Sequence, residues 1–365
     1  MGSLTNFTQQ LQQKQQQQQQ QLLSDTVEIL VSVVVSVLIV FSLFGNLLLC
    51  NIVFRRAAMR SGINLLLANL ALSDFANAVL NLPLSVVLFN MGTWPLGDVA
   101  CRINGALCFT MNIVKVLTLT TISIDRYLII VKRKDTMTPW RANAVIASSW
   151  TFAAAVSVLP VIGWGRFKFR CGYIQCLLDV ESGGNMVESY LIFVTAVTVF
   201  IPAAVFLFVY TRILRTVHRS NFRVENHPPI TPTAMHVKGR LFIDYGYKRR
   251  TSATILLLCL LLMACLLPIG VLNIVVALNG FHKSVHLKTY TAFLWLSHLH
   301  GALNPIVYFQ RIKKFRESLL EVGPKVVSLA GVVSQRSRRR IRPHVTYQVD
   351  KNDIKVSCIN LSAHF

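Results

Sequence analysis

Two charged residues, Asp74 and Lys115, stand inside long apolar stretches of the sequence. An ionisable side chain in hydrocarbon is costly, so each is a candidate functional residue. Asp74 lies 11 residues after Ile63 and Lys115 lies 11 residues before Arg126, which places both about 16 Å from the same side if the stretches are helical. Because a pair can keep both groups charged where isolated groups would be neutral, we expect an Asp74–Lys115 ion pair. The alternative, in which the Lys115 side chain reaches an interface, stays open.

Further polar residues fall at the same level. His300 lies 11 residues before Arg311, and Asn304 follows one helical turn later. Together these residues predict a polar layer inside a bundle of helices. A transporter or channel that uses Asp74 and Lys115 as a charge relay is an alternative, although the sequence lacks the internal repeats and Gly/Pro-interrupted halves frequent in transporters. It shows no constellation typical of an enzyme, a cofactor site or a metal site.

The composition is that of a membrane protein. Hydrophobic residues make up 53% of the chain and charged residues only 14%, whereas soluble domains carry about 25% charged residues. We therefore expect an all-α membrane protein, a seven-transmembrane helix bundle over residues 27–309, whose first span acts as a signal anchor. The seven apolar stretches lie at 27–54, 63–89, 101–131, 144–164, 190–213, 251–278 and 289–309.

The positions of Lys and Arg predict which side of the membrane each connection occupies. They gather after the first, third, fifth and seventh spans, as expected for cytoplasmic segments. The N-terminus is then extracellular, where Asn6 in Asn6-Phe7-Thr8 is a glycosylation sequon. The net charge of +22 lies mainly on the inner face, where anionic lipid attracts it. Nucleic-acid binding is therefore not expected.

The segments outside the spans differ in composition. Residues 1–26 contain a Gln-rich tract and are expected to be disordered. The connection 214–250 is expected to be a flexible loop, because its prolines prevent one continuous helix. Residues 310–322 alternate cations with apolar residues, which predicts a short amphipathic helix on the inner membrane surface. Residues 323–365 form a basic cytoplasmic tail.

Short motifs in all seven spans resemble those of rhodopsin-like (class A) G protein-coupled receptors. The resemblance covers residues 27–321, and the order and separation of the motifs make it specific. Segments 58–67, 128–131 and 311–317 are similar to a small branch of orphan receptors expressed in brain. The motifs are Gly45-Asn46, Leu70-Ala71-Leu72-Ser73-Asp74, Cys101 with Asp125-Arg126-Tyr127, Trp150, Pro202 with Tyr210, Cys265-Leu266-Leu267-Pro268 and Asn304-Pro305-Ile306-Val307-Tyr308.

The resemblance implies a two-state switch at the inner ends of the spans. Asp125 would hold Arg126 at rest, and release would let Arg126 meet Tyr210 and Tyr308 beside a bound heterotrimeric G protein. Arrestin is a further partner that the family implies, and the plasma membrane is the expected location. The implied coupling residues are Asp125, Arg126, Tyr127, Tyr210, Asn304, Pro305 and Tyr308, and the polar layer comprises Asn46, Asp74, Lys115, His300 and Asn304.

The resemblance also implies a disulfide between Cys101 and Cys176. Cys171 is then left over, as a free thiol or with a local partner.

Several positions depart from the family pattern. Lys115 stands where related receptors have a small hydroxyl residue that helps to bind sodium, so we expect agonist-free signalling to be insensitive to sodium. Leu266 and Leu262 replace the usual Trp and the common Phe, so the usual rotamer trigger is not expected. Lys248 stands where some relatives place an acid that holds Arg126, and appreciable basal activity is therefore expected.

The ligand is unknown, but the family implies an outer pocket between the helices. Cys108 replaces the Asp of amine receptors, and His298 replaces the retinal-binding Lys of visual pigments, so neither ligand class fits. A rim of cations at 166, 168, 170, 283 and 288 would suit an anionic lipid or an acidic peptide. A plain solvated rim, with no diffusible ligand, remains an alternative. The matching pocket positions are Cys108, Phe109, Asn112, Val194, Thr198, Asn273, Tyr290, Leu294 and His298.

Overall fold

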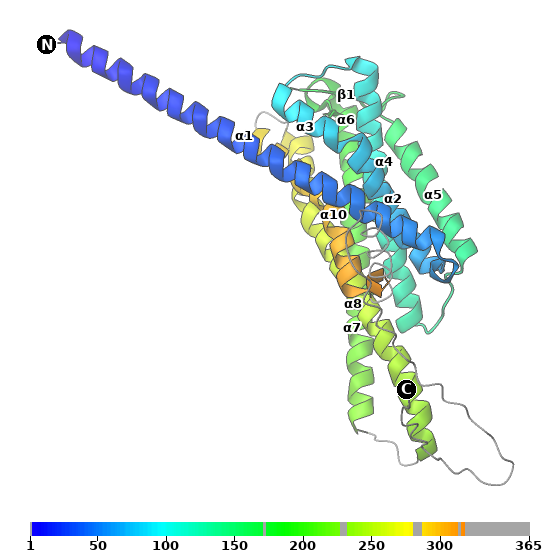
Figure 1. Cartoon of the computed structure of the whole chain (residues 1–365). Helices are drawn as coiled ribbons and strands as arrows, with labels where there is room; N and C mark the ends of the chain where they lie inside the picture. Colours follow the sequence, from blue (N-terminus) through cyan, green and yellow to red (C-terminus); the bar gives the residue numbers. More distant parts are fainter. Residues whose placement is uncertain (1, 171–172, 227–231, 280–286, 313–314, 318–365) are drawn as a thin grey trace, which may run out of the picture. The chain divides into compact units, whose positions relative to one another are not determined.

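Helices form nearly all of the structure, a computed structural model that describes residues 2–170, 173–226, 232–279, 287–312 and 315–317 (Figure 1). Two short strands, β1 (Phe167–Lys168) and β2 (Leu177–Leu178), pair antiparallel. The helices are α1 (Gly2–Arg55), η1 (Ala57–Met59), α2 (Gly62–Leu80), α3 (Leu82–Met91), α4 (Gly97–Ile130), α5 (Pro139–Val158), α6 (Val180–Thr195), η2 (Ala196–Phe200), α7 (Ile201–Asn226), α8 (Pro232–Asn279) and α10 (Leu287–Arg311).

The seven apolar stretches coincide with single helices or with runs of consecutive helices, such as α2 with α3 and α6 with η2 and α7. Within the described residues, five helical segments are long and apolar enough by themselves to cross a membrane. α5 and α10 fall short because they carry more polar residues, including Ser148 and Ser149 in α5 and His298 and His300 in α10. The five segments are Ile29–Arg55, Gly62–Met91, Gly97–Ile130, Gly184–Arg219 and Arg250–Asn279.

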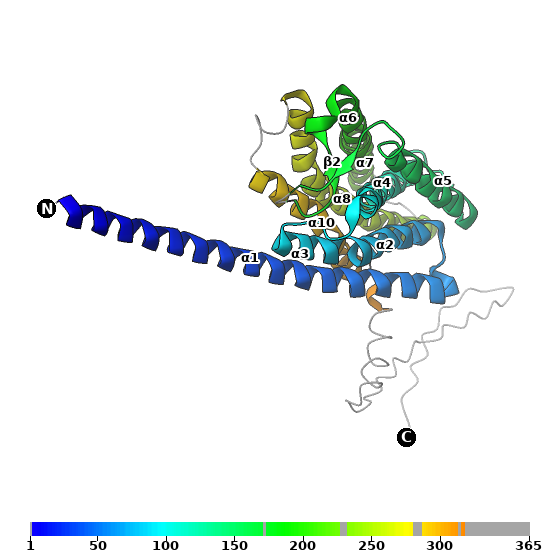
Figure 2. The same cartoon turned by 90° about the horizontal axis from the view of Figure 1, so that it is seen from above.

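α4 is the central helix of the bundle. It contacts α2 and α5 as well as α7 and α8, while α1 packs against α2 and α10 (Figures 1 and 2). Trp150 of α5 donates a hydrogen bond to Asn69 of α2 (2.8 Å), and Asn69 donates to Thr118 of α4 (2.8 Å). These bonds fix the three helices in register. Large apolar side chains such as Leu207 and Leu260 are exposed, as expected where helices face lipid.

Two apolar clusters divide the interior of the bundle along α4. One cluster includes Val116, Leu119 and Ile122, and the other includes Ile113 and Val114. Lys115 lies between them, so the polar layer separates two apolar halves.

The long helices change geometry at prolines. α2 gives way to α3 at Asn81, two residues before Pro83. The π-helix η2 precedes Pro202, which has no N–H to donate to the carbonyl of Thr198. Pro268 and Pro305 lie inside α8 and α10. Proline therefore accompanies the break between α2 and α3 and the π-helix η2, whereas the kink inside α6 falls at Gly184.

The segments outside the spans differ in part from the sequence-based expectations. α1 begins at Gly2 and so includes the Gln-rich tract for which disorder was expected over 1–26; Gln and Leu favour helices, and no proline interrupts the segment. α7 extends to Asn226 and α8 begins at Pro232, so helix replaces much of the loop expected over 214–250. The intervening prolines at 228 and 229 lie outside the described residues.

The C-terminal expectations are largely outside the structure. α10 ends at Arg311, and residues 315–317 are helical. The ring of Phe315 is buried, with its centre 6.4 Å from that of Tyr308. The amphipathic helix over 310–322 therefore stays a prediction, because residues 313–314 and 318–322 lie outside the described ranges, as does the tail 323–365.

Candidate functional site

The polar layer centres on Asp74 of α2. Lys115 Nζ of α4 lies 3.4 Å from Asp74 Oδ1, and both side chains are at most 2% exposed. Asp74 Oδ2 accepts a hydrogen bond of 2.6 Å from Asn304 Nδ2 of α10. The carboxylate thus has a cationic partner on one oxygen and an amide donor on the other, so three helices meet at one buried acid. Lys115 does not reach an interface.

His300 and Asn46 extend this layer across α10 to α1. Asn304 Nδ2 lies 3.2 Å from His300 Nδ1, and His300 is fully buried. Asn46 Nδ2 donates to the backbone carbonyl of Gly301 at 2.9 Å. A Cβ atom at Gly301 would lie only 3.0 Å from Asp74 Oδ1, so glycine allows α10 to approach the acid closely. The five residues expected in the layer lie together.

The inner end of α4 holds the expected arginine. Arg126 Nε donates to Asp125 Oδ2 at 3.1 Å, a terminal guanidinium nitrogen contacts the same oxygen, and both residues are buried. Tyr210 of α7 lies nearby, with its hydroxyl 3.3 Å from Ser123 Oγ. The ring of Tyr127 instead packs against Phe208 of α7, with ring centres 5.9 Å apart. Arg126 is therefore held locally by its neighbouring acid.

Tyr308 lies on the inner side of the polar layer. Its side chain is fully buried, and its hydroxyl has no hydrogen-bond partner within the described residues. Leaving a buried hydroxyl unpaired costs free energy. A rearrangement that gives this hydroxyl a partner would therefore be favoured.

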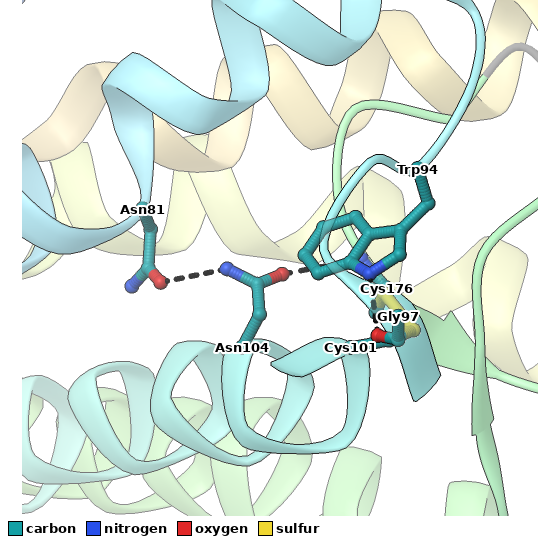
Figure 3. Close-up of a disulfide and its surroundings, with 6 residues drawn as sticks. All are labelled: Asn81, Trp94, Gly97, Cys101, Asn104 and Cys176. Atoms are coloured by element: carbon teal, nitrogen blue, oxygen red, sulfur yellow. Dashed lines mark hydrogen bonds between the residues drawn. A yellow bond between two sulfur atoms is a disulfide. The ribbon is translucent and has the colours of Figure 1, made fainter. Parts of the chain in front are cut away.

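At the outer end, Cys101 of α4 and Cys176 form a disulfide with Cα atoms 5.5 Å apart (Figure 3). This confirms the expected pairing. The side chain of Asn104, one turn below Cys101, accepts from the backbone N–H of Cys176 (3.3 Å) and donates to Asn81 (3.1 Å). Cys171, the expected leftover thiol, lies outside the described residues, as does the side chain of Asn6.

A cavity of about 90 Å³ lies below this disulfide, between α4, α6, α8 and α10. Cys108 and His298 do not line it, although both are buried. Sequence reasoning missed Gln175 and the β2 residues Leu177 and Leu178, which do line it; their closeness to Cys176 was the available signal. Seven of the expected pocket residues line the cavity, namely Phe109, Asn112, Val194, Thr198, Asn273, Tyr290 and Leu294.

The cations of the outer rim face a buried acid. Asp179 is 2% exposed and has Arg170 at 2.5 Å and Lys168 at 3.9 Å. Its backbone N–H also donates to the carbonyl of Arg166 at 2.8 Å. Two of the rim cations that would suit an anionic ligand are therefore already engaged, and Lys283 lies outside the described residues.

Comparisons with known proteins agree with this geometry. Residues 45–308 match the family described as "7 transmembrane receptor (rhodopsin family)". Squid rhodopsin has a similar structure, with a TM-score of 0.73 over 84% of this chain and 87% of that one at 20% identity. Its fold confirms the expected seven-helix bundle.

Similar proteins of known sequence cover most of the chain. The "High-affinity lysophosphatidic acid receptor" of Xenopus laevis is 34% identical over 89% of this chain and 90% of its own length. "Probable G-protein coupled receptor 63" of Mus musculus is 32% identical, over 88% and 78%. "Probable G-protein coupled receptor 45" of Mus musculus is 32% identical over 92% of both chains. A receptor is thus favoured over the alternative of a transporter or channel. The chain belongs to the rhodopsin family of seven-transmembrane receptors, as a multi-pass protein of the plasma membrane and not an enzyme.

Proposed function

We propose that the chain transmits a signal across the plasma membrane to a heterotrimeric G protein, with Arg126 as the residue that switches. The observation that carries the proposal is the buried contact between Arg126 and Asp125 at the inner end of α4. A guanidinium in this position has two alternative environments, the neighbouring carboxylate or a polar cleft opened between α4, α7 and α10. The G protein would stabilise the second one.

Tyr210 and Tyr308 are the proposed partners of released Arg126. The Tyr210 hydroxyl contacts Ser123 Oγ and lies 3.8 Å from Cys259 Sγ, weak neutral partners that it could exchange for a cation. When Arg126 is released, the Tyr308 hydroxyl also gains a hydrogen-bond partner. Pro202, Pro268 and Pro305 each interrupt the helical hydrogen bonding of a moving segment, which lowers the cost of bending.

The test compares Arg126→Ala with the wild-type receptor in membranes, using guanine-nucleotide exchange on a panel of G protein α-subunits. We expect the wild type to accelerate exchange on at least one subunit without added agonist, and Arg126→Ala to abolish this acceleration. Arg55→Ala removes an exposed cation from the same membrane face and serves as the matched control. Equal exchange with Arg126→Ala and the wild type, at equal surface expression, would rule out the proposed switch. Arrestin recruitment measured in parallel tests the second partner.

An anionic lipid remains the proposed ligand class because a relative is named for lysophosphatidic acid. Two observations oppose it: Lys168 and Arg170 already face Asp179, and the cavity holds about 90 Å³. Application of lysophosphatidic acid to the wild-type receptor tests the candidate directly. No change in nucleotide exchange up to saturating lipid would eliminate it.

A further inference from the structure

The outer hairpin, defined here as residues 167–170 and 173–178, fills much of the cleft in which the family's ligand pocket lies. Its strands pair Phe167 with Leu178 and Lys168 with Leu177. Phe167 is 3% exposed and Ile174 is fully buried. These apolar side chains point into the bundle and become part of the outer apolar cluster.

Gly105 of α4 makes room for this hairpin. A Cβ atom at Gly105 would lie 2.4 Å from Cδ1 of Phe167, far inside van der Waals contact. The Phe167 ring also packs against Phe109, one turn further along α4, with ring centres 5.6 Å apart. Gly105 and Phe167 therefore form a close-fitting contact that any larger residue at 105 would disturb.

A closed circuit of buried polar side chains ties the hairpin to α2 and α10. Gln175 Oε1 lies 3.1 Å from His298 Nε2, and His298 Nδ1 lies 3.3 Å from Asn77 Nδ2. Asn81 donates to Asn77 at 2.9 Å. The circuit continues through Asn104 to the backbone of Cys176, the neighbour of Gln175 (Figure 3).

The circuit is chemically complete. With Nε2 protonated, the His298 ring donates to Gln175 and accepts from Asn77, so each member has a partner for the atom that it presents. Buried polar groups that satisfy one another specify a single arrangement. Asn77 lies on α2 one turn from Asp74, so the circuit reaches the helix that carries the central acid of the polar layer.

The space left under the hairpin is small. Pockets for diffusible ligands usually hold about 300–1,000 Å³, whereas this cavity holds about 90 Å³. The hairpin occupies the place that such a ligand would need.

We propose that the outer hairpin is an internal ligand of this receptor, and that its seated position stabilises the resting arrangement. The hairpin is seated in the same structure in which Asp125 holds Arg126, and a contact stabilises the state in which it is made. This inference rests on the proposed coupling to a G protein. Release of the hairpin raises signalling without any added ligand.

The test is a double-mutant cycle with Gly105→Ala and Phe167→Ala. Basal nucleotide exchange is measured for both single variants and the double variant, at matched surface expression. Each single variant should raise exchange about fivefold or more. Basal exchange by the double variant should not exceed that of the more active single variant. Once Phe167 is alanine, the Cβ introduced by Gly105→Ala has no aromatic ring to clash with. Val99→Ala and Phe152→Ala, both at exposed positions, are the matched controls and should behave as the wild type.

A second measurement reports, without a G protein, whether the outer hairpin covers the cavity. Asn112→Cys places a thiol in the wall of the cavity, and its reaction with a membrane-impermeant methanethiosulfonate is compared with that of the receptor carrying only its native cysteines. Both Gly105→Ala and Phe167→Ala should accelerate this labelling. Unchanged labelling would show that the hairpin does not close the cleft and would overturn the proposal.

The two measurements separate the possible failures. Faster labelling with unchanged or reduced exchange, in a receptor whose wild type does catalyse exchange, overturns the internal-ligand proposal alone. Additive effects in the double variant also overturn it, because they would show that Gly105 and Phe167 act independently. No exchange by any receptor on any α-subunit overturns the proposed function, and with it this inference.

Discussion

Lys115 Nζ lies 3.4 Å from Asp74 Oδ1 in the middle of the bundle, and neither side chain is more than 2% exposed. The ammonium occupies the position beside the carboxylate that would otherwise suit a mobile cation. Asp74 belongs to α2 and Lys115 to α4, so the ion pair also holds these two helices together.

We predict that replacing Lys115 or Asp74 alone destabilises the receptor more than replacing both. Lys115→Met leaves a buried carboxylate unpaired, and Asp74→Asn leaves a buried ammonium unpaired; each should lower the free energy of unfolding by roughly 3–5 kcal/mol. The double variant should recover most of this loss, as measured by thermal unfolding of the purified receptor. Lys288→Met, at an exposed lysine, is the control. A double variant less stable than either single variant would contradict the pairing.

Basal signalling should be insensitive to sodium. Replacing sodium chloride with N-methyl-D-glucamine chloride should leave wild-type nucleotide exchange unchanged, because Lys115 already supplies the positive charge beside Asp74. Lys115→Ser should make exchange depend on sodium, and adding Asp74→Asn should remove that dependence again. A clear response of the wild type to sodium would refute this account of Lys115.

Gly45 should tolerate no side chain. A Cβ atom there would lie 2.5 Å from Cβ of Pro305, where α1 meets α10. Gly45→Ala should therefore destabilise the receptor by about 1–3 kcal/mol, seen as a lower melting temperature and reduced surface expression. Leu47→Ala, at a half-exposed position of α1, should have a much smaller effect. Equal melting temperatures for Gly45→Ala and the wild type would show that the two helices separate without cost.

An acid at position 248 should reduce basal activity. Lys248→Glu would restore an acid at the position in α8 where some relatives place one that holds Arg126 in the resting state. Nucleotide exchange should fall, whereas Lys238→Glu, which lies earlier in the same helix, should leave it unchanged. Similar reductions with both variants would indicate a general effect of inner-face charge instead of a specific lock.

The sequence was sufficient for features that depend on periodicity and depth. Counting residues from the inner boundary placed Asp74 and Lys115 at one level, and the structure brings them into contact. Family motifs indicated the Cys101–Cys176 disulfide. Such features follow from the fixed rise of a helix and from positions shared across a family.

Features that depend on side-chain fit could not be read from the sequence. Nothing in the pattern around Phe167 shows that its ring enters the space left by the missing Cβ of Gly105. His298 was expected to line the pocket, but its two nitrogens are used by Gln175 and Asn77. The start of α1 at Gly2 does not follow from the Gln-rich composition either, because that composition suits both a solvated coil and a helix.

The placement of Lys115 next to Asp74 also concerns the electric field of the membrane. The potential acts on each elementary charge with about 2.3 kcal/mol per 100 mV across the bilayer. Two opposite charges at one depth form a neutral unit, so a shift of α2 with α4 moves no net charge through that field. A receptor with a lone carboxylate and an exchangeable cation at this depth would gain or lose a charge as it switches. Here the voltage of the cell has no net charge on which to act at the centre of the bundle.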